Sequence, residues 1–452
     1  MNKKNFKTAL FLLFALALVF PILPAAATQP DSAKIYGKFG YLSGADPRAC
    51  ETGRVVPFEY EDGYFAKSSD RYDHDLAKMS LALSLASYDY GELEWLLGQI
   101  QFKQIEPNEY YLTSNGDKTK TETDNIGVAI ANKEIGGCVV VAVVVRGFGY
   151  GAEWAGNFNV GSDDNFHEGF KKARDIVTRE IGLYLDRNQI GGDIKIWLTG
   201  YSRAGAAANL AAGEILEEQK FDAADVYAYC FEAPMGLKKS DKSDKSDEKD
   251  TGYSGIFNIV NPNDPVTKIP PANWGFCRYG TDIYLPSPKS NGEYKELSEK
   301  MKEFYREYRA DYQNEPDRID DFREWAYLKG QSYSFASSPG AFADKLLESA
   351  AGLLDCGDYV KRAQQTLVDS CADAYGLALN LEALVFALPD VALQIALIHP
   401  GALDTASEGG GVLLLAHYPD LCLAWMYSLD GNTFAIDEAV PAVVILRLLL
   451  IS

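Results

Sequence analysis

The feature that most constrains this chain is a strand, a tight turn and a helix that follow one another directly between residues 194 and 217. The apolar run Ile194–Thr199 leads into Gly-Tyr-Ser-Arg-Ala-Gly, and an alanine-rich helix is expected over Arg203–Glu217. Such a turn exposes the hydroxyl of its central serine, Ser202, and directs the helix N-terminus at the place where negative charge develops in a reaction. The segment therefore predicts a nucleophilic serine.

Small residues surround this serine, as a sharp turn between a strand and a helix requires. Gly200 precedes it by two positions, Ala204 follows by two, and Gly205 follows by three. The usual pattern is G-x-S-x-G, so alanine stands in the last position here and the glycine comes one residue later. Alanine is the mildest replacement, and we interpret Gly200, Ala204 and Gly205 as the nucleophile elbow.

Strands and helices alternate along the first two thirds of the chain. Segment 137–145 consists almost entirely of small or β-branched apolar residues, which is typical of a strand buried on both faces. Apolar residues at helical spacing occur in segment 72–100 and again after Phe166. This alternation predicts a mainly parallel, doubly wound α/β sheet. The strands that we expect are 137–145, 194–199, 225–231 and 254–260.

Composition changes along the chain suggest its domain organisation. Residues 1–27 contain a lysine-rich start, a short apolar run and a small-residue site, which is the pattern of a secretory signal peptide. A hydrolase-type core is expected over 28–297, with a mobile Ser-Asp-Lys loop at 238–250, followed by a helical cap insertion at 298–398. Residues 399–452 would complete the core. Because of the signal-peptide pattern at residues 1–27, we expect a secreted, extracellular protein.

Charge and cysteine content exclude several functional classes. A formal net charge of −21 makes the chain a poor partner for nucleic acid or an anionic membrane surface. Its seven cysteines include no C-x-x-C pair, which excludes a zinc ribbon. We expect neither a metal nor an organic cofactor. The sequence does not settle calcium dependence or the oligomeric state.

A nucleophilic serine needs a general base and a carboxylate that orients the base. Asp264 is the strongest candidate for the acid because it lies in a constrained Asn-Asp-Pro turn just after a buried strand. Two histidines follow Ser202 in the chain, His399 and His417. We favour His417, which follows an apolar run and precedes an amphipathic helix.

Five motifs in a fixed order give the chain a resemblance to the fungal-type (class 3) lipase family of the α/β-hydrolase superfamily. The resemblance covers roughly residues 72 to 275, and segment 72–88 and the helical insert are similar to a bacterial, secreted lipase-like branch. The motifs are Val145-Arg146-Gly147, His167-Glu168-Gly169-Phe170, Gly200–Ala206, Phe231-Glu232-Ala233-Pro234 and Asn261–Pro270.

The resemblance implies an α/β-hydrolase fold with a helical cap or lid before the C-terminal histidine. It implies Ser202 as nucleophile, Asp264 as acid, and an oxyanion hole made by the backbone N–H groups of Phe148 and Arg203. Phe148 stands where many family members carry a serine or threonine hydroxyl, so only its backbone donor is available. His167 matches a structural position of the family.

The sequence therefore predicts a carboxylic ester hydrolase, similar to triacylglycerol lipases, that cleaves acyl esters through an acyl-enzyme. Its substrate would be an acyl ester or a lipid, with transient contact at lipid interfaces as a further expectation. Two alternatives stay open. One is a degenerate hydrolase scaffold that acts as a binding protein, and the other is a peptidase or acyltransferase with the same triad.

Overall fold

The computed structural model describes residues 32–37, 56–113, 125–147, 165–238, 251–262, 264, 266–268, 270, 276–286, 294–308, 417 and 419–429. Several expectations fall outside these residues. They are the signal peptide 1–27, Phe148, nearly all of the charged loop 238–250, residues 309–398 of the expected cap, and His399. The statements below concern the described residues.

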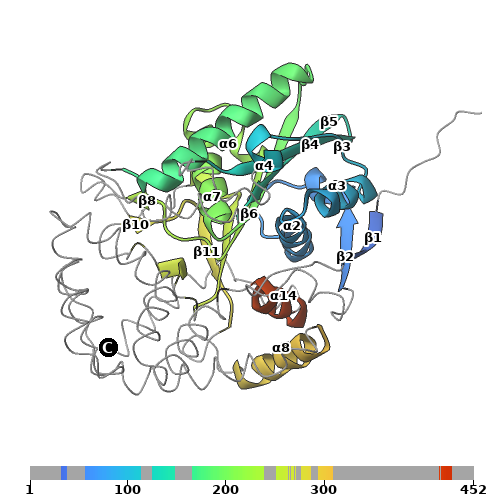
Figure 1. Cartoon of the computed structure of the whole chain (residues 1–452), viewed down its shortest axis with the longest axis vertical. Coiled ribbons are helices and arrows are strands. Elements are labelled where there is room, and N and C mark those ends of the chain that lie inside the picture. The colour runs from blue at the N-terminus through green and yellow to red at the C-terminus, as the bar shows by residue number, and fades with distance from the viewer. Residues whose placement is uncertain are drawn as a thin grey trace, which may run out of the picture.

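A seven-stranded sheet forms the centre of the molecule (Figure 1). Its order is β11-β9-β7-β6-β5-β4-β3, and the five strands from β11 to β5 are parallel. The expected α/β-hydrolase fold with a mainly parallel sheet is confirmed. The strands are β3 (Lys103–Pro107), β4 (Gly127–Ile135), β5 (Cys138–Arg146), β6 (Ile194–Tyr201), β7 (Val226–Phe231), β9 (Ile256–Val260) and β11 (Thr281–Tyr284).

The other edge of the sheet is antiparallel. β4 pairs with β5 and β3 pairs with β4, both in antiparallel register. Gly136 and Gly137 form the two-residue connection between β4 and β5, and both have positive φ, +60° and +96°. Glycine adopts this conformation without steric cost, which suits a tight hairpin. The strands predicted from the sequence include β5 but not β4, so this hairpin was not predicted.

Helices cover both faces of the sheet (Figure 1). α6 (Glu168–Arg187) and α7 (Arg203–Glu217) pack on one face, and α2 (His74–Ala86) and α3 (Tyr90–Gln99) lie on the other. The sequence of β5 is apolar throughout because both faces of this strand are buried. Its side chains alternate between the two core layers, with Val141, Val143 and Val145 on the α6/α7 side and Val140, Ala142 and Val144 on the α2 side.

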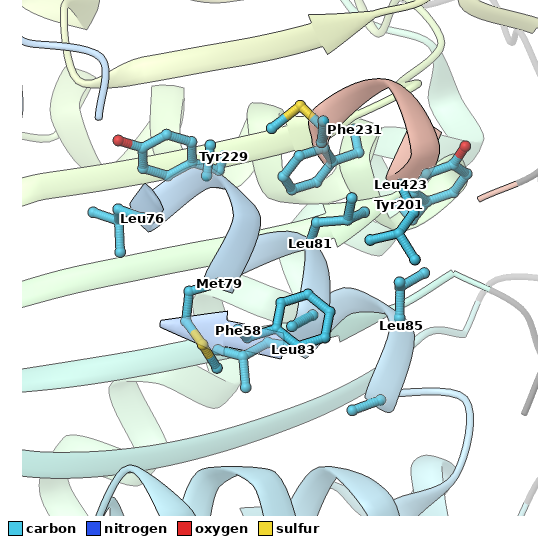
Figure 2. Close-up of a cluster of buried hydrophobic side chains, with 14 of the residues drawn as sticks. Phe58, Leu76, Met79, Leu81, Leu83, Leu85, Tyr201, Tyr229, Phe231 and Leu423 are labelled. Atoms are coloured by element: carbon cyan, nitrogen blue, oxygen red, sulfur yellow. The ribbon is translucent and has the colours of Figure 1, made fainter. Parts of the chain in front are cut away.

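α2 is the central element of the second core layer (Figure 2). Leu76, Met79, Leu81, Leu83 and Leu85 are each exposed by 1% or less, so nearly the whole circumference of the helix is buried. Figure 2 places Tyr201, Tyr229 and Phe231 of the sheet and Leu423 beside it. Asp89 caps the N-terminus of α3 by accepting from the Glu92 N–H, which explains why segment 72–100 forms two helices.

Two later helices complete this layer. α8 (Tyr294–Tyr308) packs against α14 (Pro419–Ser428), and the rings of Phe304 and Tyr427 stack at 5.2 Å. α8 thus begins before the expected domain boundary at 297/298, and its apolar face joins the core. No helix of the described part of the chain is long and apolar enough to cross a membrane.

Small elements surround this core. They are the antiparallel pair β1 (Ser32–Gly37) and β2 (Val56–Glu61), the pair β8 (Leu237–Lys238) and β10 (Phe276–Cys277), helix α4 (Glu109–Thr113), and 3-10 turns at Asp62–Ala66, Ala223–Asp225, Thr251–Tyr253 and Val266–Lys268.

Candidate active site

Ser202 occupies the turn between β6 and α7. Its backbone has φ 58° and ψ −126°, a conformation that non-glycine residues rarely adopt. The Ser202 N–H donates to the carbonyl of Phe231 at 2.8 Å, so the neighbouring strand holds the turn in place. Strained residues of this kind concentrate at functional sites. The strain is confined to this one residue, because β6 ends at Tyr201 and α7 begins at Arg203.

The small residues of the elbow are required by steric contact. A Cβ atom at Gly200 would lie 2.5 Å from the backbone of Ala204, and one at Gly205 would lie 3.0 Å from the Phe231 carbonyl oxygen. Ala204 itself is fully buried and fits without a clash. The alanine in place of the usual glycine therefore leaves the turn intact.

Three polar side chains meet at this turn. The His417 Nε2 atom lies 2.7 Å from the Ser202 Oγ atom, and His417 Nδ1 lies 2.6 Å from Asp264 Oδ2. The geometry assigns the proton on Nδ1 to a hydrogen bond with the carboxylate, which leaves Nε2 free to accept from the serine. Serine, histidine and aspartate thus form a continuous hydrogen-bonded chain.

Asp264 is held rigidly after β9. Its carboxylate is fully buried, and Oδ1 accepts from the backbone N–H of Val266 at 2.8 Å. The Asp264 N–H donates to the Asn261 carbonyl at 3.0 Å, and the Thr267 hydroxyl donates to the Asp264 carbonyl at 2.9 Å. These bonds close the turn and leave Oδ2 directed at His417.

His417 reaches the site from a segment far away in sequence. It lies immediately before α14, and its backbone carbonyl accepts from the Tyr201 hydroxyl at 2.9 Å. Burial is the main reason that the pKa of Tyr201 lies well above its usual value, so the hydroxyl stays a donor. The residue next to the elbow therefore holds the histidine segment in register.

The two histidines before Ser202 lie elsewhere. His167 caps α6, where Nδ1 accepts from the Phe170 N–H at 3.3 Å. His74 contacts the carbonyls of Met426 and Leu429 at the end of α14 through Nε2, at 2.9 and 3.2 Å. Both have structural contacts, and neither is hydrogen-bonded to Ser202 among the contacts of the described residues.

One of the two expected oxyanion donors belongs to the described part of the chain. Arg203 is the first residue of α7, so its backbone N–H lies at the N-terminal end of this helix. Phe148 lies outside the described residues. Gly147 just before it packs so closely on the Tyr201 carbonyl that a Cβ atom would clash there. The end of β5 therefore lies against the elbow.

Sequence reasoning passed over Glu232, a second buried carboxyl next to Asp264. Its side chain is fully buried, and its Oε2 accepts from the Asn261 N–H at 2.8 Å. Burial, and then the charge of Asp264, raise the pKa of Glu232 well above its usual value. The signal in the sequence was a charged residue inside the otherwise apolar Phe231-Glu232-Ala233-Pro234.

No group of three or more His, Cys, Asp or Glu side chains among the described residues could hold a metal ion. Of the seven cysteines, Cys138, Cys230, Cys277 and Cys422 belong to the part that the structure covers, and no disulfide joins any two of these four.

Comparisons with known proteins find one matching family and several similar solved structures. Residues 142–274 match the family described as lipase (class 3). Similar solved structures include a fungal lipase–inhibitor complex (17% identity, TM-score 0.35, 47% of this chain and 80% of that one). The Rhizomucor miehei lipase propeptide complex has 16% identity, a TM-score of 0.33, and coverage of 47% and 68%. The lipase from Rhizopus microsporus var. chinensis has 16% identity, a TM-score of 0.34, and coverage of 48% and 75%.

No curated protein matches the chain. The family match includes both Ser202 and Asp264, and β6 and α7 lie within it. Residues 142–274 are thus similar to the class 3 lipases on an α/β-hydrolase fold, and this match supports a carboxylic ester hydrolase of the lipase type.

Proposed function

We propose that this chain is a secreted serine ester hydrolase in which Ser202, His417 and Asp264 form the catalytic triad. The observation that carries the proposal is the pair of short hydrogen bonds that joins these three side chains, 2.7 Å at Ser202 and 2.6 Å at Asp264. A serine hydroxyl is a weak nucleophile on its own, and this arrangement supplies the base and the group that orients the base.

The reaction begins when His417 Nε2 takes the proton of the Ser202 hydroxyl while Oγ attacks the ester carbonyl carbon. The tetrahedral intermediate collapses, the C–O bond to the alcohol breaks, and His417 gives its proton to the leaving alcohol. Water then attacks the acyl-enzyme with His417 again as base, which releases the carboxylic acid and restores the serine. Asp264 holds the imidazole orientation and stabilises its protonated form throughout.

The oxyanion of the intermediate needs donors on the side opposite His417. The Arg203 N–H and the positive end of α7 supply one, and the backbone N–H of Phe148 supplies the other in this proposal. The alanine-rich α7 brings no charged side chain into its first turn other than Arg203, whose side chain is buried and whose Nη2 donates to the Asn125 carbonyl at 3.3 Å. The stabilisation therefore comes from backbone groups.

We further propose that the substrate is an acyl ester of a lipid type and that the helical segment 298–398 covers the pocket and selects the acyl chain. Secretion through residues 1–27 and transient contact with lipid interfaces belong to the same proposal. The family match of residues 142–274 supports the substrate class.

Hydrolysis of a p-nitrophenyl ester series, from acetate to palmitate, tests this proposal with the wild type and Ser202→Ala. We expect hydrolysis by the wild type and its loss in the variant, with the chain-length optimum separating an esterase from a lipase. A folded wild type that hydrolyses none of the esters and resists a fluorophosphonate probe would instead support a binding scaffold.

A further inference from the structure

Glu232 lies directly behind the acid of the proposed triad. It follows β7, and its backbone N–H donates to the Ile259 carbonyl of β9 at 2.8 Å. Its φ is +46°, in the left-handed region that a glycine adopts more readily. A buried carboxyl at a strained backbone position is unfavourable for folding on two counts, which indicates a purpose beyond packing.

The two oxygens of Glu232 have different surroundings. Oε2 accepts from the Asn261 N–H at 2.8 Å, whereas no N–H or O–H donor of the described residues reaches the buried Oε1. The carboxyl groups of Glu232 and Asp264 interact directly. Asp264 already accepts from Val266 and from His417, so the negative charge is better stabilised on Asp264. An Oε1 atom without a donor is explained when it carries the proton itself.

We propose that Glu232 is protonated in the folded enzyme and donates a hydrogen bond from Oε1 to Asp264, as a positioning residue for the Asp264–His417 pair. The side chain then holds both ends of one turn, since it accepts from Asn261 and donates to Asp264. This inference rests on the proposed function, because it assigns Glu232 a part in orienting the triad.

The other titratable groups that face Glu232 do not compete for this role. Cys422 reaches it from α14, where its thiol is a weak donor to the carboxyl whose effect on the pKa of Glu232 is smaller than those of burial and of Asp264, and Tyr201 faces it from β6. Burial is the main cause that raises the pKa of each well above its usual value, so both stay neutral when Asp264 is ionised. Glu232 is therefore the group of this cluster whose protonation state depends on its contacts with Asn261 and Asp264.

Two substitutions of similar size separate the donor from the packing. Glu232→Gln keeps an acceptor for Asn261 and a donor for Asp264 but cannot ionise, whereas Glu232→Met fills similar space and has no donor. If the methionine variant does not fold, Glu232→Gly replaces it, because glycine suits the left-handed backbone and also lacks the donor.

The first readout is unfolding stability against pH, which does not depend on any activity. A neutral Glu232 must lose its proton on unfolding above its usual pKa of 4.5, so the wild type loses stability relative to Glu232→Gln as pH rises from there. We expect the ratio of the two unfolding constants to change by up to about tenfold per pH unit between 4.5 and 8. A ratio that stays constant with pH would overturn the proposal.

The second readout is the position of the proton between His417 and Asp264. The low-field NMR resonance of the His417 Nδ1 proton should match in the wild type and Glu232→Gln, and should shift or broaden in Glu232→Met. An unchanged resonance in Glu232→Met would refute the positioning role, whether or not the protein hydrolyses esters.

Kinetics provide the third readout. For an ester that the wild type hydrolyses, we expect kcat/KM within about threefold for Glu232→Gln and a loss of at least about tenfold for Glu232→Met, mostly in kcat. The wild type should also show an alkaline decline, where Glu232 finally ionises, that Glu232→Gln lacks. Equal activity of the Gln and Met variants would contradict the inference. A wild type without esterase activity, but with the expected stability series, would refute the proposed function and leave the protonation of Glu232 supported.

Discussion

The serine and the histidine of the site are held in different ways. Ser202 is positioned by its own neighbours in the chain, because β6, the turn and α7 are continuous and the close packing at Gly200 leaves no room for a side chain. His417 is 215 residues further along, and contacts between distant segments hold it. The position of the proposed nucleophile is therefore a local property of the sequence, whereas that of the proposed base depends on how well α14 docks against the core.

Asp264 links the two regions, so removal of its charge should have the largest effect on kcat. Asp264→Asn keeps the shape but allows the wrong histidine tautomer, and we expect kcat to fall by about ten-thousand-fold. Asp282→Asn is a control in the same sheet, since Asp282 pairs with Arg278 at 2.8 Å and does not contact His417. Steady-state kinetics with a p-nitrophenyl ester decide the comparison, and a loss of less than tenfold in Asp264→Asn would contradict the assigned role.

One added methyl group should disrupt the turn that holds Ser202. Gly200→Ala would place its Cβ 2.5 Å from the Ala204 backbone, and we expect a loss of about 2 kcal/mol in unfolding free energy together with most of the activity. Gly182→Ala on the open surface of α6 has no atom within 4 Å and should gain about 0.5 to 1 kcal/mol. Denaturant unfolding of both variants measures the difference, and similar stabilities would argue against a steric elbow.

The position of the His417 segment should depend on a single hydroxyl group, that of Tyr201. Tyr201→Phe removes the donor to the His417 carbonyl, and we expect a loss of about 1 kcal/mol and a severalfold lower kcat. Tyr184→Phe also removes a donor to a carbonyl, that of Gln104 at 2.9 Å, but on the opposite face of the sheet. Its stability loss should be at least as large, because its hydroxyl also accepts from the Asn132 side-chain amide at 2.6 Å, and its kcat should be unchanged. Equal kcat values in the two variants would show that the tyrosine does not position the base.

The smallest effect concerns the far end of α14, where His74 accepts from the Tyr72 hydroxyl and donates to two carbonyls. Burial, with the charge of Lys78 next, lowers the pKa of His74 below 6.5. The unfolded chain therefore binds this proton more readily, and the contribution of His74 to stability is present above pH 6.5 and is lost as pH falls.

His74→Gln can retain a donor to the carbonyls but does not titrate in this range. We expect the midpoint temperature of the wild type to decrease relative to the variant as pH falls below 6.5. Thermal unfolding at several pH values measures this change. A pH-independent difference would mean that His74 does not clamp α14 in its neutral form.

The same contrast explains what could be predicted from the sequence. The strand–turn–helix around Ser202 and the buried strand β5 were predictable, since local spacing and apolar content determine both. The antiparallel edge β3–β4 and the break between α2 and α3 were missed because a two-glycine turn and a single Asp89 cap are weak signals. Glu232 was quoted in its motif, but its proximity to Asp264 arises only when β7 and β9 lie side by side.

The choice between the two candidate histidines shows the same limit. The apolar run before His417 and the helix after it favour this residue over His399, but only the docking of α14 brings its imidazole to Ser202. The roles of the triad, the Phe148 donor, the signal peptide and the cap stay predictions.

The most direct test of the central claim is the labelling of Ser202 by a fluorophosphonate, located by peptide mass spectrometry in the wild type, His417→Gln and His399→Gln. The account predicts rapid labelling at Ser202 in the wild type and His399→Gln, and almost none in His417→Gln. Labelling that survives His417→Gln but disappears in His399→Gln, or a wild type that is not labelled at Ser202, would contradict it.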